Sequence, residues 1–371
     1  MKYYLIAGEA SGDLHGGRLV KAIRKSDPAA EIRAWGGDQM EKAGATLVKH
    51  FRDLAFMGFI EVIKNLPTIV RNIRFCKKDI LAFQPDVLVL IDYPGFNLTI
   101  APWAKANGYK VAYYISPQVW AWKEGRVRKM KSCIDQLLVI LPFEKEYYQK
   151  KWNWSVDYVG HPLIEAVENF QKEPVHTIPA SKPIIALLPG SRKQEIEKKL
   201  PIMLSVSPHF LHYQFVVAKA PGIEASYYHQ WENKFPNVLF VEAKTYSLLQ
   251  QAEAALVTSG TATLETALFN VPQVVCYKGA PLSYAIGKHV VKIKYISLVN
   301  LILDRPLVKE LIQHELTTRN LIHELQQIIS GGTARQSMLD GYLQLQTILK
   351  QEAPASDKVA NAVVELAKKS V

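Results

Sequence analysis

The sequence has few cysteines, no long apolar run and no pair of aspartates at Asp-x-Asp spacing. Its three cysteines lie far apart and never at C-x-x-C spacing, which excludes a disulfide framework and a cysteine-based zinc site. No run approaches the ~20 apolar residues of a membrane span, and the N-terminal segment turns at Gly8 before a signal sequence could form. The missing Asp-x-Asp pair argues against a metal-bridged diphosphate. We therefore expect a cytoplasmic protein that uses neither a metal ion nor a cofactor.

Length and charge set the next limits. A chain of 371 residues exceeds what one hydrophobic core usually organises, so two domains are expected. Its apolar content of 49% and charged content of 21% are ordinary for a soluble enzyme. A net charge of +11 needs an anionic partner: nucleic acid, an anionic membrane or a phosphorylated substrate. Because the basic residues are scattered and no nucleic-acid-binding motif is present, we exclude nucleic acid.

Both halves of the chain alternate apolar runs, glycine-rich turns and helical patterns, as parallel α/β sheets do. Predicted strands cover residues 3–7, 31–35, 86–91, 110–115, 136–141, 184–188, 214–218, 238–241, 253–257 and 273–276. A polar, proline-rich stretch from Glu173 to Pro183 is typical of a linker. The sequence therefore predicts two Rossmann-like doubly wound domains facing a cleft, over residues 1–170 and 183–332, followed by helices over 333–371. This arrangement suits sugar transfer from a nucleotide donor.

Acidic side chains and one histidine follow two predicted strands of the first domain. Glu9, Asp13 and His15 come after the first strand, and Asp92 directly follows the near-continuous apolar strand over 86–91. Ligands of open α/β sheets bind at the carboxyl ends of the strands, so we expect these groups to lie together. Asp92 is the first candidate for the base that takes a hydroxyl proton, with the other three behind it. Each could instead be a helix cap or a buried structural group.

A glycine turn in the second half opens a helix after the strand over 253–257. Small residues and a glycine at a helix start leave outward backbone N–H groups, which attract a phosphate. Glu265 lies one turn further and can accept hydrogen bonds from the vicinal hydroxyls of a ribose. The alternative is a simple capped helix with Glu265 in its first turns. The residues of this turn are Ser259, Gly260, Thr261 and Ala262.

A second glycine turn, Gly190, Ser191 and Arg192, follows the strand over 184–188. The guanidinium of Arg192 can bind the donor diphosphate in a bidentate fork. With the N–H groups of the first turn it would stabilise a leaving UDP without a metal.

Two further stretches can contact a lipid or a sugar phosphate. Residues 56–78 are densely apolar and then basic, which is typical of a helix in the interface of an anionic membrane. The alternative is a buried helix kinked at Pro67. In the stretch 116–130, Trp120 and Trp122 accompany four basic residues that include Arg126. These residues can form an aromatic and cationic wall for a sugar phosphate, or pack under a helix.

Ten tracts, in order over nearly the whole chain, form a recognisable set: Gly8–Asp13, Met57–Val62, Ile91–Asn97, Ser116–Trp122, Leu141–Lys145, Gly160-His161, Leu187–Arg192, Ser259–Glu265, Ser297–Leu301 and Leu307–Leu311. Together these tracts resemble the lipid-A-disaccharide synthase family. Several of these residue strings are rare, so the set indicates a family more specifically than any single glycine loop does. Two positions depart from the family pattern. This chain has Gly95 where many members have a second acidic residue, and Val299 where the family often has proline.

The resemblance implies an inverting glycosyltransferase of GT-B type. It would join UDP-2,3-diacylglucosamine to 2,3-diacylglucosamine 1-phosphate, giving the β(1→6) lipid A disaccharide 1-phosphate and UDP. It also implies that the protein works as a peripheral protein on the cytoplasmic face of the anionic inner membrane, and it adds Asn300 to the donor site. The helices over 333–371 are then expected to cross back and pack on the first domain or on a partner chain in a homodimer. The expected membrane or acyl-chain surface is Ile60, Val62, Ile63, Leu66, Ile69 and Val70. Rival interpretations are a UDP-N-acetylglucosamine epimerase and a peptidoglycan glycosyltransferase.

Overall fold

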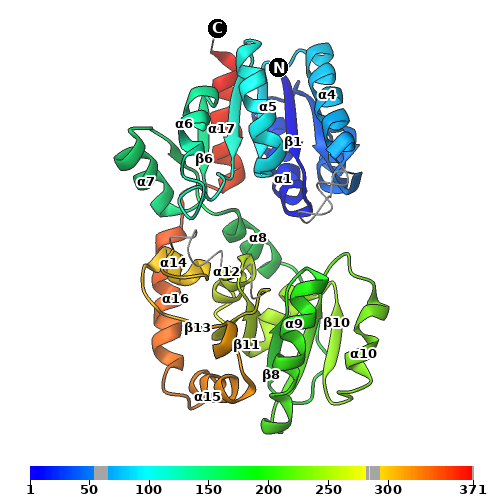
Figure 1. Cartoon of the computed structure of the whole chain (residues 1–371), viewed down its shortest axis with the longest axis vertical. Helices are drawn as coiled ribbons and strands as arrows, with labels where there is room; N and C mark the ends of the chain where they lie inside the picture. The colour runs from blue at the N-terminus through cyan, green and yellow to red at the C-terminus, as the bar shows by residue number, and fades with distance from the viewer. Residues whose placement is uncertain (54–65, 281–283, 285–292, 370–371) are drawn as a thin grey trace. The chain divides into compact units, whose positions relative to one another are not determined.

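The computed structural model describes residues 1–53, 66–280, 284 and 293–369. The chain forms two compact units, one of Met1–Pro162 with Gln351–Val371 and one of Leu163–Lys350 (Figure 1). Each unit contains its own parallel sheet covered by helices, so the predicted fold class is confirmed. Within the described residues, no helix is both long enough and apolar enough to cross a bilayer.

The first unit is built on a seven-stranded sheet in the order β3-β2-β1-β4-β5-β6-β7. All of its pairings are parallel, and β4 lies between β1 and β5 with every residue buried. Such a strand packs helices on both faces, which explains its continuous run of valine, leucine and isoleucine. The strands are β1 (Lys2–Ala7), β2 (Glu31–Gly36), β3 (Thr46–His50), β4 (Val87–Ile91), β5 (Lys110–Tyr114), β6 (Gln136–Val139) and β7 (Asp157–Tyr158).

Helices cover both faces of this sheet. One core contains side chains of β1, β4, α1 and α17, and the other packs α4, α5 and α6 against the opposite strand faces. The helices are α1 (Ala10–Ser26), α2 (Asp38–Lys42), η1 (Phe51–Asp53), α4 (Leu66–Phe83), α5 (Pro94–Ala106), α6 (Arg126–Cys133), α7 (Pro142–Trp152) and α17 (Ala355–Lys368). The two helices after Thr333 belong to different units: α17 is part of the first, whereas α16 (Arg335–Leu349) is part of the second.

The second unit has a six-stranded parallel sheet in the order β10-β9-β8-β11-β12-β13. Its strands are β8 (Ile184–Leu188), β9 (Gln214–Lys219), β10 (Leu239–Glu242), β11 (Ala252–Thr258), β12 (Gln273–Tyr277) and β13 (Lys309–Ile312). Its helices are α8 (Pro162–Gln171), α9 (Lys193–Leu204), η2 (Ser207–His209), η3 (Ala225–Tyr228), α10 (His229–Glu232), α11 (Thr245–Gln251), α12 (Thr261–Leu268), α14 (Leu298–Leu303), η4 (Gln313–Glu315), α15 (Thr318–Ile328) and α16. The neighbouring strands β8 and β11 deliver the two predicted glycine turns to one edge of this sheet.

Candidate active-site residues

Asp92 lies at the carboxyl edge of the first sheet, directly after β4. Asp92 and Tyr93 both adopt left-handed backbone conformations, with φ of 46° and 47°. The Asp92 carbonyl oxygen accepts hydrogen bonds from Asn97 Nδ2 at 2.8 Å and Tyr113 Oη at 2.6 Å, while its N–H donates to Tyr114 O at 2.9 Å. A left-handed conformation strains the backbone of a residue other than glycine, and it persists only where the surroundings fix that backbone. These three bonds hold the turn, and with it the direction of the Asp92 side chain.

Burial raises the pKa of the half-buried Asp92 carboxyl to about 6, and the negative charge of Glu9 adds to the rise. A hydrogen bond from the Tyr93 N–H to the carboxylate lowers the pKa and so opposes this rise. Glu9 is exposed at the N-cap of α1, and β1 lies beside β4, so the two carboxylates share one sheet edge. A carboxylate with this pKa is ionised near neutral pH and is still a stronger base than an ordinary aspartate.

Asp13 has a structural set of partners. Its buried carboxylate accepts hydrogen bonds from the N–H groups of Gly37, Gln39 and Met40 at 2.7, 3.0 and 3.1 Å. These contacts hold the turn after β2 and satisfy the first N–H groups of α2. The carboxylate therefore positions backbone at the site edge, and its oxygens are occupied.

His15 lies beside His161, a residue from the loop after β7. Burial lowers the pKa of His15 to about 4 and that of His161 to about 3, so both rings are neutral at physiological pH. The positive charge of Arg18 contributes to the shift at His15, and the His15 charge to that at His161. A neutral imidazole with so low a pKa is a weaker proton acceptor than Asp92.

The two tryptophans of the stretch 116–130 differ in their surroundings. Trp120 packs edge-on against Phe143 at 4.9 Å between ring centroids, and its Nε1 donates to Glu144 Oε1 at 3.1 Å. Burial raises the pKa of Glu144 to about 7. Trp122 is 45% exposed, with Lys123 Nζ 4.1 Å from its ring centroid. Trp120 therefore packs under α7, whereas Trp122 can meet a ligand.

In the second unit, the turn after β8 presents Arg192. Gly190 has a φ of +119°, a conformation in which any other residue would be strained, and a Cβ added there would lie 2.5 Å from Glu195 Oε2. The Ser191 N–H donates to the same oxygen at 3.3 Å. Arg192 is the N-cap of α9, and its side chain is 64% exposed with Glu195 Oε1 no closer than 4.0 Å. The guanidinium is thus available to an anion.

The turn after β11 contains Gly260, which has a φ of +144° and open space within 4 Å of the position that a Cβ would take. Ser259 Oγ donates to Ile296 O at 2.7 Å, and the Thr263 N–H donates to Gly260 O at 3.1 Å. Across the described part of the chain, the N–H groups of Gly260, Thr261 and Ala262 donate to no protein acceptor. With the start of α12, they form an anion-binding geometry.

Glu265 is half-buried on α12, and burial raises its pKa. Its Oε1 accepts a hydrogen bond from Tyr246 Oη at 2.8 Å. Tyr246 also packs against Phe269 at 5.2 Å and Phe170 at 5.3 Å between ring centroids. Sequence reasoning missed Tyr246 because nothing in its local pattern distinguishes it from a core aromatic residue.

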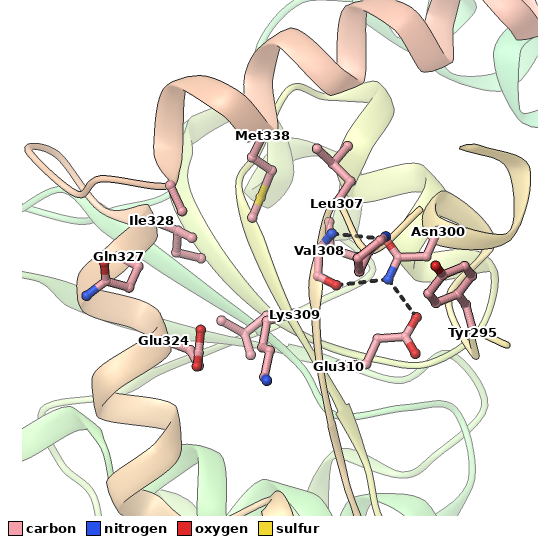
Figure 2. Close-up of a pocket in the computed structure, with 13 residues that line it drawn as sticks. Tyr295, Asn300, Leu307, Val308, Lys309, Glu310, Glu324, Gln327, Ile328 and Met338 are labelled. Atoms are coloured by element: carbon pink, nitrogen blue, oxygen red, sulfur yellow. Dashed lines mark hydrogen bonds between the residues drawn. The ribbon is translucent and has the colours of Figure 1, made fainter. Parts of the chain in front are cut away.

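Asn300 is fully buried, and its amide bonds to the chain itself (Figure 2). Its Nδ2 donates to Val308 O and Glu310 Oε1, each at 2.9 Å, and its Oδ1 accepts from Val308 N at 2.9 Å. Glu310 also accepts from Ser297 Oγ at 2.7 Å. Asn300 thus connects α14 to β13. It also lines a cavity of about 320 Å³, and the other predicted donor-binding residues do not line that cavity. Sequence reasoning did not anticipate the partnership of Asn300 with Glu310, because the short edge strand β13 (KELI) carries no local signal for it.

Lys199 is a buried cation on the sheet-facing side of α9, with a relative exposure of 2%. Burial lowers the pKa of Lys199 to about 8. The charges of Lys198 and Arg192 lower this pKa further, whereas Glu195 and Cys276 raise it. Among the described residues it has no ion pair within 4.0 Å and no side-chain hydrogen bond. A buried ammonium without such a partner costs folding free energy.

Replacing this lysine, Lys199→Met, is expected to raise the free energy of unfolding at neutral pH by about 1–3 kcal/mol. The folded-state pKa lies near 8 and the unfolded one near 10.5, so the wild-type penalty is complete below pH 8 and disappears as pH rises toward 10.5. The gain should therefore shrink between these values. Thermal unfolding at several pH values measures it, with Lys198→Met as the matched control. A less stable Lys199→Met protein at neutral pH would show that the buried ammonium is not a net cost.

Solved structures share the two-unit fold. The UDP-GlcNAc 2-epimerase of Neisseria meningitidis, bound to UDP-GlcNAc, superposes with a TM-score of 0.68 at 12% identity, covering 98% of this chain and 100% of that one. The glycotransferase of kitacinnamycin also gives 0.68, at 11% identity and 99% coverage of each chain. These neighbours and the two sheets place the protein in the GT-B class of folds.

Sequence relatives narrow the class to one family. The model of the family described as lipid-A-disaccharide synthetase matches residues 3–364. The lipid-A-disaccharide synthase of Syntrophus aciditrophicus is 36% identical over 376 residues, covering 99% of this chain and 98% of that protein. The one from Acidobacterium capsulatum is 35% identical over 377 residues, with 96% and 93% coverage. This chain belongs to the lipid-A-disaccharide synthase family.

Proposed function

We propose that this chain transfers 2,3-diacylglucosamine from UDP to 2,3-diacylglucosamine 1-phosphate, giving the β(1→6) disaccharide 1-phosphate and UDP. Membership of the family over residues 3–364 supports the reaction. The observation that carries the mechanism is the half-buried Asp92 carboxylate, held in a strained turn at the sheet edge with its pKa raised to about 6.

On the acceptor side, Asp92 takes the proton from the attacking hydroxyl. The hydroxyl oxygen forms the new bond to the donor's anomeric carbon while the bond from that carbon to UDP breaks. One displacement of this kind inverts the configuration at the anomeric carbon. Glu9 raises the pKa of Asp92 and so increases its strength as a base. Asp13 holds the neighbouring backbone through its three N–H contacts.

On the donor side, charge develops on the diphosphate as UDP leaves. Arg192 and the N–H groups at the start of α12 would stabilise that charge with oriented donors, so we propose transfer without a metal ion. Glu265 would accept hydrogen bonds from the ribose hydroxyls, with Tyr246 fixing its carboxylate. Ser191 and Gly190 shape the turn that presents Arg192. The roles proposed for Asn300 and Ser259 are indirect, because both side chains bond to nearby backbone.

We also propose that α4 contacts an anionic membrane. Leu66, Val70 and Leu81 are 56%, 37% and 48% exposed on this helix, and the basic residues Arg74 and Lys78 are exposed beside them. Apolar side chains flanked by cations suit the boundary between headgroups and acyl chains. Ile69 is half-buried on the same helix, whereas Ile60, Val62 and Ile63 lie outside the described residues.

Serine at Leu66 and Val70 together is expected to weaken binding to vesicles containing anionic lipid by about 30-fold, because each exposed aliphatic side chain would lose roughly 1 kcal/mol of burial, about 2 kcal/mol together. Vesicle co-sedimentation measures the change. Leu343→Ser, which removes an exposed leucine from α16 in the other unit, is the matched control. Unchanged sedimentation of the double variant would remove α4 from the membrane surface.

The reaction itself is tested by incubating the protein with UDP-diacylglucosamine and diacylglucosamine 1-phosphate and following both UDP and the disaccharide product. We expect UDP release only when both substrates are present. Conversion of the nucleotide sugar without an acceptor would favour an epimerase instead, and no turnover of the pair would reject the proposal.

A further inference from the structure

A cationic pocket lies between α5 and α6 of the first unit, two helices that contact each other. Its volume is about 190 Å³, equal to roughly six water molecules at ~30 Å³ each. Leu98 and Met130 supply apolar lining, and Gly95 and Thr99 belong to the α5 side. A pocket of this size accepts a compact polar group attached to a larger ligand.

Arg126 and Lys129, one helical turn apart on α6, bring two positive charges to this pocket. Neither side chain forms an ion pair or donates a hydrogen bond within the part of the chain that the structure describes. No carboxylate of the described ranges lines the pocket. Two uncompensated cations in one small pocket are complementary to a doubly charged anion.

The pocket also adjoins the proposed base. Pro94 and Gly95, which line it, are the second and third residues after Asp92. On the other side, the Arg126 charge acts on Tyr113, whose hydroxyl donates to the Asp92 carbonyl at 2.6 Å. A ligand bound in the pocket therefore has its remaining atoms close to the Asp92 turn.

We propose that this pocket binds the phosphate monoester of the acceptor, an inference that rests on the proposed function. The acceptor carries its phosphate and its attacking hydroxyl on one hexose. Binding the phosphate at Arg126 and Lys129 would place that hydroxyl at Asp92, so the two cations orient the acceptor rather than take part in the proton transfer. A membrane phospholipid offers the same phosphate chemistry, and the experiment must separate these two sources.

The test compares two acceptors, diacylglucosamine 1-phosphate and diacylglucosamine, in the wild-type protein and in a variant with both Arg126→Gln and Lys129→Gln. In the wild type, removing the phosphate should lower kcat/KM by about 10- to 100-fold, as expected for lost charge-assisted hydrogen bonds. In the variant, both acceptors should react at about the same low rate, because the group that recognises the phosphate is gone. The matched control is Arg128→Gln, which changes an exposed cation of α6 outside the pocket.

Three other results would overturn the inference. Equal discrimination between the acceptors in wild type and variant would place the phosphate elsewhere. Loss of vesicle binding with unchanged discrimination would assign the cations to membrane phosphate. If Arg128→Gln also lost the discrimination between the two acceptors, the preference for the phosphate would come from the net charge of the protein rather than from this pocket. If the wild type turned over neither acceptor, the proposed function would fail first. An unchanged circular dichroism spectrum and an unchanged thermal unfolding midpoint show that the variant is folded.

Discussion

Asp92→Asn is expected to lower kcat by about 10²–10⁴-fold while leaving the Kd for UDP unchanged. Asparagine keeps the shape of the side chain but cannot take the acceptor proton. The turn should survive, because Asn97, Tyr113 and Tyr114 bond to the Asp92 backbone rather than to its carboxylate. Single-turnover kinetics and calorimetric titration with UDP measure the two quantities. Full turnover in the variant would remove Asp92 as the base.

The pH profile gives an independent measurement of the same base. In the wild type, kcat/KM should fall below a pH of about 6, because protonated Asp92 cannot accept a proton. The charge of Glu9 raises this pKa, so Glu9→Gln should shift the acid limb to lower pH. Glu31→Gln, at the amino end of β2, is the matched control and should not shift it. An unmoved limb in Glu9→Gln would show that the two carboxylates are not coupled.

Arg192→Ala is expected to lower kcat/KM for the donor by about 10²–10³-fold, the usual cost of removing one donor to a developing negative charge. The exposed guanidinium has only a loose contact with Glu195, at 4.0 Å, so its main partner would be the diphosphate. Arg192→Lys should recover less than the full activity, because an ammonium keeps the charge but cannot form the planar fork.

The control for this effect is Lys193→Ala on the same helix turn. Lys193 is also exposed and contacts the Tyr227 ring at 5.1 Å, so its loss changes net charge equally without touching the proposed diphosphate. Equal loss in both variants would indicate a general electrostatic effect. Stopped-flow UDP binding separates weakened donor binding from slowed chemistry.

The fold class was predictable because central parallel strands are buried on both faces. The predicted strands over 86–91, 184–188 and 273–276 match β4, β8 and β12 within one residue. The strands that went unpredicted, β3, β7 and β13, all lie at sheet edges. An edge strand has one neighbour and less apolar packing, so its sequence lacks a continuous apolar run.

The sequence was enough to place the candidate site residues at strand ends, but it could not predict their hydrogen-bond partners. Both glycine turns follow the strands that the pattern indicated, and the φ angles of Gly190 and Gly260 explain why glycine is there. The hydrogen bonds of Asp13 cross 24–27 residues and those of Trp120 cross 24. Such contacts arise only from tertiary packing. The sequence pattern therefore could not show that three backbone N–H groups occupy the Asp13 carboxylate, whereas Asp92 has one such donor, Tyr93.

The position of α17 has a consequence for how the protein is made. Four residues of α17 lie fully or almost fully buried in the core that contains β1 and α1, although they are synthesised after the whole second unit: Val359, Ala360, Val363 and Val364. The ribosome must first complete Leu163–Lys350, which takes about 10–40 s at roughly 5–20 residues per second. During that interval the first sheet has an uncovered apolar face. The nascent chain therefore depends on α17, which is synthesised after the second unit, or on a chaperone, to protect a domain whose strands emerged first.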